Sequence, residues 1–200
     1  MCFAALSTTY ARYARHMVPY YNPGMRYRRD QTPGASFFFT LVTFARQPLF
    51  ADGANVDRLR AAFARVIRDH PFGIDALVLL PDHLHCIWTL PEADAGFALR
   101  WNLIKGNFTR SLPKAAKRPR PGERREQRVW QRRYWEHRLR DDDDFARHCD
   151  YIHWNPVKHG LVASPADWPH STFSRFVARG IYPPDWGALM PDERGLASGE

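Results

Sequence analysis

The chain has 200 residues, of which 44% are hydrophobic and 25% charged, a composition typical of one soluble globular domain rather than a disordered chain. Its apolar runs, such as residues 37–44, are far shorter than the roughly 20 residues of a membrane span, and the N-terminus shows no secretory signal. Three cysteines without a CxxC pair indicate free thiols in a reducing cytoplasm. Composition therefore excludes membrane-spanning and disulfide-stabilised secreted proteins.

Positive charge is concentrated in one segment. From Arg100 to Arg140 there are 14 basic and three acidic residues, so the rest of the chain sums to −3 although the whole carries +8. This distribution is typical of a nucleic-acid contact face, and a solvated basic loop would show the same charge. Aromatic residues spaced through the segment favour an ordered surface on which bases stack. The residues predicted to bind DNA are Lys105, Arg110, Arg124, Arg125, Arg128, Arg132, Arg133, Tyr134 and Trp135.

The first half of the chain predicts an extension followed by alternating strands and a helix. Residues 1–24 lack periodicity and read as a poorly ordered N-terminal extension. The β-branched and aromatic run 36–44 predicts a buried strand. Apolar residues spaced by three and four predict an amphipathic helix over 52–69. The apolar runs 72–80 and 84–90, separated by three residues, predict a β-hairpin.

The second half predicts a helix, a loop and a strand. A helix is expected over 95–112, where Pro113 ends it. The segment 114–126 is rich in Pro, Arg and Lys and predicts a mobile loop. The aromatic segment 129–139 predicts the fourth strand.

A last helix is signalled by four consecutive aspartates, residues 141–144, which provide an N-cap and a negative first turn. It is expected to end near Asn155-Pro156, because the residue before proline disfavours helical geometry. From residue 166 the chain is expected to pack irregularly over the domain. The order βαββαβα predicts an α+β, ferredoxin-like (RRM-like) fold with an antiparallel four-stranded sheet and an added C-terminal helix, in one domain over 25–187 followed by a tail, 188–200.

Two histidines alternate with an apolar residue at the start of the second hairpin strand. Residues i and i+2 of a strand share a face, so His83 and His85 can converge on one metal ion while Leu84 points to the opposite face. His-x-His alone is a weak signal, because two histidines share a strand face by chance. Placing polar imidazoles in an otherwise apolar hairpin nevertheless costs free energy, which favours a functional role for them.

The last predicted helix carries a second set of polar residues. Tyr151 and Asn155 are four residues apart and share a helix face with His148. A tyrosine hydroxyl is a useful nucleophile when a metal ion polarises a phosphodiester for it, and an amide oxygen is a suitable ligand for such an ion. The alternative is structural: Tyr151 covers the core, Asn155 ends the helix and His148 is a core residue or supports the site.

Three motifs in this order resemble the REP-associated tyrosine transposases, bacterial relatives of the single-tyrosine transposases in the HUH endonuclease class. They are residues 81–91 (PDHLHCIWTLP), 130–137 (WQRRYWEH) and 151–162 (YIHWNPVKHGLV). The resemblance covers about residues 25–187. It implies binding and cutting of single-stranded DNA at palindromic repeats that form hairpins.

The resemblance also implies the site residues. His83 and His85 match the metal ligands, Tyr151 matches the nucleophile, and Asn155 matches a third polar ligand. The implied ion is Mg²⁺ or Mn²⁺, and imidazole ligands by themselves would also admit Zn²⁺ or Co²⁺. The last predicted helix is then the catalytic helix.

The leading hypothesis is a metal-dependent DNA endonuclease and strand transferase that forms a 5′-phosphotyrosine and needs no ATP. The expected setting is the bacterial cytoplasm, at the nucleoid, with hairpin DNA as partner, no membrane, and a monomer or homodimer. A histidine-nucleophile nucleotide hydrolase needs a third alternating histidine, and the chain has Cys86-Ile87 instead. A protein that binds repeat hairpins without cutting them remains the alternative, because the basic segment supports it equally.

Overall fold

The structure, a computed structural model, describes residues 30–113 and 129–188. The chain divides into two compact units, Met1–Asp30 and Gln31–Glu200, and the elements below belong to the second. The predicted extension, the predicted loop 114–126 and all but the first residue of the predicted tail lie outside the described residues. Of the helices in the described ranges, none combines the length and apolarity needed to cross a bilayer.

The core of the unit is a four-stranded antiparallel sheet in the order β2-β3-β1-β4. The strands are β1 (Ser36–Val42), β2 (Gly73–Leu79), β3 (His83–Thr89) and β4 (Trp135–Arg138). With one helix between β1 and β2 and another between β3 and β4, this is the predicted ferredoxin-like arrangement. The fold prediction is confirmed.

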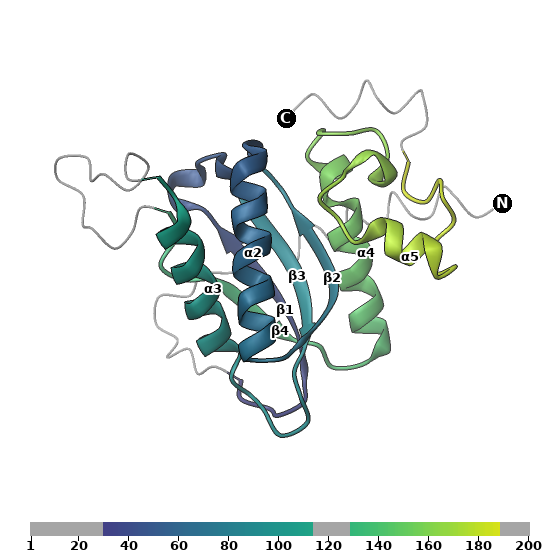
Figure 1. Cartoon of the computed structure of the whole chain (residues 1–200). Helices are drawn as coiled ribbons and strands as arrows, with labels where there is room; N and C mark the ends of the chain where they lie inside the picture. Colours follow the sequence, from purple (N-terminus) through teal and green to yellow (C-terminus); the bar gives the residue numbers. More distant parts are fainter. Residues whose placement is uncertain (1–29, 114–128, 189–200) are drawn as a thin grey trace, which may run out of the picture. The chain divides into compact units, whose positions relative to one another are not determined.

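Helices α2 (Gly53–Asp69) and α3 (Phe97–Ser111) cover one face of the sheet (Figure 1). Asp52 caps α2 by accepting a hydrogen bond from the backbone N–H two residues on, at 2.9 Å. Between the helices and the sheet the indole rings of Trp88 and Trp101 stack at 4.0 Å. Burial of such large aromatic surfaces is the main stabilising contribution on this face.

Helix α4 (Asp142–Lys158) packs on the opposite face, together with α5 (Phe173–Ala178) (Figure 1). The segment after residue 166, predicted to be irregular, therefore contains a short helix. It also extends the sheet edge, because Thr172 donates a backbone hydrogen bond to Leu77 O at 2.9 Å. The apolar cluster under α4 and α5 consists of Phe38, Ala76, Val78, Leu80, Ile87, Leu139, Cys149, Ile152, Phe173, Phe176 and Tyr182.

The predicted end of the last helix, near Asn155-Pro156, is wrong, because α4 continues to Lys158. Proline removes only one helical N–H. The C-terminal end of α4 is capped after Pro156 by a hydrogen bond from Leu161 N–H to Pro156 O at 3.0 Å. The intervening Gly160 has a φ of +64°, which is typical of such a cap. Tyr151, Asn155 and Lys158 consequently lie on one continuous helical face.

The fourth strand is shorter than the predicted 129–139, because only Trp135–Arg138 pairs with β1 in the ladder. Upstream, Trp130 makes an isolated bridge with Thr43, and Gln131 N–H donates to Val42 O at 2.9 Å. The segment just before β4 therefore runs beside the end of β1, where Val42 pairs with His83 of β3.

Candidate functional site

His83 and His85 of β3 lie on the sheet face that α4 covers. Their ring centroids are 5.0 Å apart, and they are only 5% and 4% exposed. Leu84 between them packs in the opposite cluster, under α2 and α3. The predicted alternation of the three residues is confirmed.

Each ring is held through its Nδ1 atom. His83 Nδ1 lies 2.5 Å from Asp82 Oδ1, and His85 Nδ1 lies 2.8 Å from Thr40 Oγ1. A hydrogen bond at Nδ1 fixes the ring and leaves Nε2 for a ligand, as in the second-sphere contacts of metal-binding histidines. Burial lowers the pKa of both histidines, and for His83 the carboxylate of Asp82 opposes the change. Both rings are thus neutral near pH 7, the form that binds metals.

Asp82 is itself fixed by a strained turn. Its Oδ2 accepts from Arg46 at 2.9 Å, and its backbone carbonyl accepts from Thr43 N–H at 2.8 Å. Ala45 and Arg46 both have left-handed backbones, with φ of 52° and 50°, which costs of order 1–3 kcal/mol each for non-glycine residues. This turn places the Arg46 guanidinium against the Asp82 carboxylate, and the carboxylate in turn orients His83.

Of the predicted residues of α4, the structure places Tyr151 against His85 and Asn155 beside Tyr151. The Tyr151 ring lies edge-on to His85, with centroids 5.1 Å apart. Burial raises the pKa of Tyr151, and the neighbouring Asn155 amide opposes the rise. Asn155 is fully buried, and its amide lies near the Tyr151 hydroxyl, but neither amide atom makes a hydrogen bond of normal geometry with any described residue.

The unsatisfied Asn155 amide bears on whether His83, His85 and Asn155 could hold a metal ion. A buried amide without a partner costs about 1–3 kcal/mol, and an ion that accepts its oxygen as a ligand would remove that cost. Two imidazoles stand on the strand beside the same helix, each held through Nδ1 and without a hydrogen-bond partner at Nε2 among residues 30–113 and 129–188. Nitrogen and amide oxygen ligands suit Mn²⁺ and, less strongly, Mg²⁺, so His83, His85 and Asn155 fit the predicted cation.

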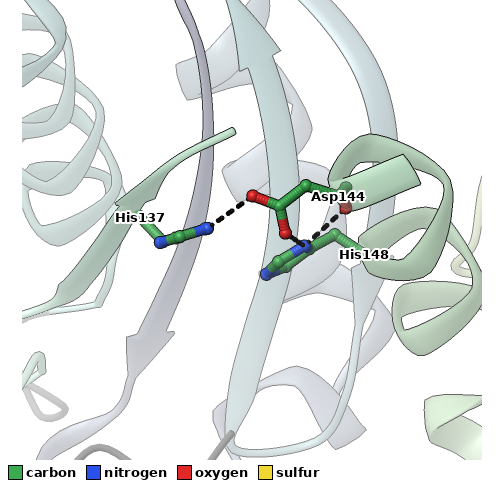
Figure 2. Close-up of side chains that lie close together, drawn as sticks. All are labelled: His137, Asp144 and His148. Carbon is green, nitrogen blue, oxygen red and sulfur yellow. Dashed lines mark hydrogen bonds and ion pairs between the residues drawn. The ribbon is translucent and has the colours of Figure 1, made fainter. Parts of the chain in front are cut away.

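A second polar cluster lies one turn towards the start of α4. Figure 2 shows His137 of β4 and His148 of α4 on either side of the Asp144 carboxylate, with His137 Nε2 at 2.9 Å from Oδ2 and His148 Nδ1 at 3.3 Å from Oδ1. Their ligand atoms lie within 4.8 Å of one another, so this group could hold a metal ion. The sequence did not identify His137 and Asp144 as candidates.

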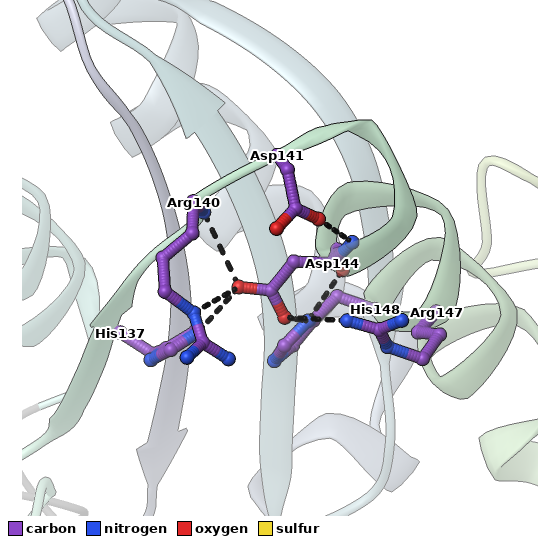
Figure 3. Close-up of polar contacts among 6 residues, drawn as sticks. All are labelled: His137, Arg140, Asp141, Asp144, Arg147 and His148. Atoms are coloured by element: carbon purple, nitrogen blue, oxygen red, sulfur yellow. Dashed lines mark hydrogen bonds and ion pairs between the residues drawn. The ribbon is translucent and has the colours of Figure 1, made fainter.

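In the structure, however, N–H groups already surround Asp144 (Figure 3). Arg140 approaches Oδ2 with Nε at 3.3 Å, and Arg147 lies 3.7 Å from Oδ1. His148 Nδ1 also lies 2.7 Å from the Asp144 carbonyl oxygen, which only accepts, so Nδ1 carries a proton. Burial alone would raise the pKa of Asp144. The contacts from His137 and Arg140 outweigh burial and lower this pKa to about 2. The cluster therefore links β4 to the first turn of α4, and an ion would have to displace these contacts.

The predicted DNA contacts separate into three groups. Lys105 and Arg110 lie on α3, on the face opposite α4, and Lys105 Nζ donates to Gln131 O at 3.1 Å, beside the segment that carries Arg132 and Arg133. Exposed in the segment before β4 are Arg132 and Arg133. Arg124, Arg125 and Arg128 lie outside the described residues.

The two predicted aromatic contacts face opposite sides of the sheet. Tyr134 packs against the cluster under α2 and α3, with its ring 6.0 Å from Trp101. Trp135 pairs with Thr40 in the ladder and packs edge-on to Phe38 at 5.5 Å, on the face that also carries His85. Of the two, only Trp135 lies on the sheet face that carries His85.

Comparisons with known proteins place the chain beside one group of bacterial proteins. The REP-associated tyrosine transposase of Escherichia coli K12 is 44% identical over 166 residues, spanning 83% of this chain and 93% of the relative. A Haemophilus influenzae protein of the same name is 44% identical over 163 residues, 80% of this chain and 92% of the relative. A solved REP-associated tyrosine transposase bound to a REP hairpin aligns with a TM-score of 0.71 and 43% identity, covering 84% of this chain and 95% of that one. No family model matches the chain.

Proposed function

Because the chain belongs to the REP-associated tyrosine transposase family, we propose that it is a metal-dependent endonuclease and strand transferase acting on single-stranded DNA beside palindromic repeat hairpins. The observation that carries the proposal is the fully buried Asn155 amide, unsatisfied among the described residues, on the same helix as Tyr151, whose ring lies against His85.

The proposed reaction is a transesterification. Tyr151 Oη attacks the phosphorus, the bond from phosphorus to the 3′ oxygen breaks, and a 5′-phosphotyrosine and a free 3′-hydroxyl result. The proton lost by the phenol balances the proton gained by the 3′ oxygen, and the phosphoester is conserved, so no ATP is consumed. A cation bound by His83, His85 and Asn155 would supply Lewis-acid polarisation of the phosphate.

The chain's own residues prepare this step in two ways. Asp82 and Thr40 hold the two imidazoles with Nε2 outward, and Phe38, 6.0 Å from Tyr151 between ring centroids, supports the phenol from the sheet. Since burial raises the pKa of Tyr151, the phenol is protonated near pH 7 and must lose its proton as it attacks. The attack therefore depends on a charged environment that favours the phenolate.

DNA binding is proposed for the domain over 25–187, within the cytoplasm of a bacterium. Exposed Arg132 and Arg133 precede β4, at the sheet end where Val42 pairs with His83. Phosphate contacts from such arginines would hold a strand across the site without reading its sequence. The solved relative bound to a REP hairpin makes a hairpin with single-stranded flanks the substrate to test.

The decisive assay measures cleavage of an end-labelled REP-type hairpin with single-stranded flanks, in Mg²⁺, in Mn²⁺ and in EDTA. Wild type should cut only with the metal, and His85→Ala should bind the hairpin but not cut it. Arg65→Ala is the matched control, because Arg65 is exposed on α2, on the opposite face of the sheet. Hairpin binding with no metal-dependent cleavage by wild type would favour the binding-only alternative.

A metal titration assigns the ion to one of the two clusters. The probe is Mn²⁺ followed by electron paramagnetic resonance in wild type, His85→Ala and His137→Ala. We expect loss of tight binding only in His85→Ala, because Asp144 is already surrounded by hydrogen-bond donors. Loss only in His137→Ala would move the ion to the Asp144 cluster and refute the proposed ligand set.

A further inference from the structure

Lys158 lies in the last turn of α4, seven residues after Tyr151 and on the same face. Its Nζ lies 5.0 Å from the centroid of the Tyr151 ring. This position exists because α4 continues past Pro156, and a helix ending at Asn155 would carry the ammonium away from the phenol. Lys158 belongs to the motif 151–162, but no role was assigned to it from the sequence.

Lys158 lacks an anionic partner in the part of the chain that the structure describes. No carboxylate there lies within 4.0 Å of its ammonium, whereas Arg46 and Arg100 each bind an aspartate at 2.9 and 2.6 Å. Its neighbours are themselves basic or neutral: the next residue, His159, lies 5.2 Å from His83 between ring centroids. The Lys158 side chain is exposed, its ammonium lies over the Tyr151 ring, and partial burial lowers its pKa.

An exposed ammonium above the ring of the proposed nucleophile favours one kind of ligand. The group that would satisfy it must be anionic and must reach the space between the Tyr151 ring and the two histidines. Lysine binds phosphate oxygens as a compact point charge. In the last turn of a helix a lysine also interacts favourably with the helix dipole, but that interaction does not require contact with a tyrosine.

We propose that Lys158 binds the phosphodiester that Tyr151 attacks, as a catalytic cation that neutralises charge on the non-bridging oxygens. The inference rests on the proposed function, because it takes the phosphodiester as the substrate of Tyr151. It adds a residue outside the predicted set of Tyr151, His83, His85 and Asn155, and it supplies the positive charge that lets a buried phenol attack.

The first test measures single-turnover cleavage of the hairpin by Lys158→Met, Lys158→Arg and the control Arg65→Ala. Methionine retains much of the side-chain length without the charge. We expect Lys158→Met to cut about 100-fold more slowly, in line with the loss of one preorganised charge-stabilising group, with hairpin affinity changed less than about threefold because many other phosphates are bound. Lys158→Arg should recover part of the rate, and Arg65→Ala should match wild type.

The second test does not depend on cleavage. Methylphosphonate, which is uncharged, replaces one phosphate at a time in the single-stranded flank, and the affinity of wild type and Lys158→Met is measured. We expect one position at which the substitution weakens binding by wild type but not by Lys158→Met.

The outcomes separate the two proposals. If wild type cuts and Lys158→Met cuts at the same rate, the role of Lys158 is refuted and the proposed function stands. If wild type does not cut at all, the proposed function fails, and the methylphosphonate series still decides on Lys158. Equal losses for both proteins at every position would overturn the assignment.

Discussion

The contacts of His153 predict how the free energy of unfolding changes with pH. The ring is fully buried and joins α4 to the C-terminal segment, with Nε2 at 2.9 Å from Thr172 Oγ1 and Nδ1 at 3.3 Å from Tyr182 Oη. Tyr182 donates to Asp150 at 2.7 Å, so its oxygen accepts from Nδ1–H. The Thr172 hydroxyl has two acceptors within reach, Nε2 at 2.9 Å and Leu77 O at 3.2 Å, and donates to Nε2 when the ring is neutral. A neutral ring with one proton satisfies both contacts, and burial lowers the His153 pKa to about 3.

The size of the His153 contribution to stability follows from the linkage between proton binding and folding. Between pH 6.5 and pH 3 the unfolded chain binds a proton at His153 and the native protein does not, so the native state loses stability as the pH falls. The loss approaches about 1.4 kcal/mol per pH unit, which gives about 2 kcal/mol at pH 5 relative to pH 7.5. Above pH 6.5 the contribution is constant, because the ring is neutral in both states.

Urea denaturation at pH 7.5, 6 and 5 measures this contribution in wild type and in His153→Gln. Glutamine keeps a polar side chain but does not titrate, and the other histidines are common to both proteins. We expect the free energy of unfolding of wild type to fall about 2 kcal/mol more than that of His153→Gln between pH 7.5 and pH 5. A difference between the two proteins that does not change with pH would show that native His153 is not held neutral.

Three further predictions concern the site and its supports. Asp82→Asn should raise the Mn²⁺ concentration for half-maximal cleavage about 10–100-fold, because it disturbs the contact that orients His83, and unchanged metal dependence would contradict this. Arg132→Ala should lower the slope of log affinity against log salt by about 0.7 on single-stranded DNA; an unaltered slope would remove Arg132 from the interface. Asp144→Asn should lower the free energy of unfolding by about 2 kcal/mol, measured by urea denaturation, whereas wild-type stability would show that the β4–α4 cluster contributes little.

Periodicity explains what the sequence could predict of the site. Strand alternation places His83 and His85 on one face and Leu84 on the other, and the structure has this arrangement. Helical spacing likewise puts Tyr151 and Asn155 on one face of α4. Local rules of period two and period 3.6 therefore assemble most of the candidate site.

Contacts distant in the sequence explain what it could not predict. Thr40 holds His85 from 45 residues away, and no local pattern signals that pairing. The end of α4 was misplaced because the cost of Pro156 is offset by bonds around Gly160, outside the helix. Charge counting grouped Lys105 with Arg132 but gave no contact between them, whereas in the structure Lys105 Nζ donates to Gln131 O at 3.1 Å, next to Arg132.

The central claim is that Tyr151 becomes covalently joined to the 5′ end of cut DNA. Intact-protein mass spectrometry of wild type incubated with the hairpin and Mg²⁺ should show the mass of the protein plus that of the 5′-phosphorylated fragment, and peptide mapping should place the addition on Tyr151. Tyr151→Phe should bind the hairpin with nearly unchanged affinity and show no adduct. Cleavage by wild type without any adduct, or an adduct that persists in Tyr151→Phe, would contradict the account.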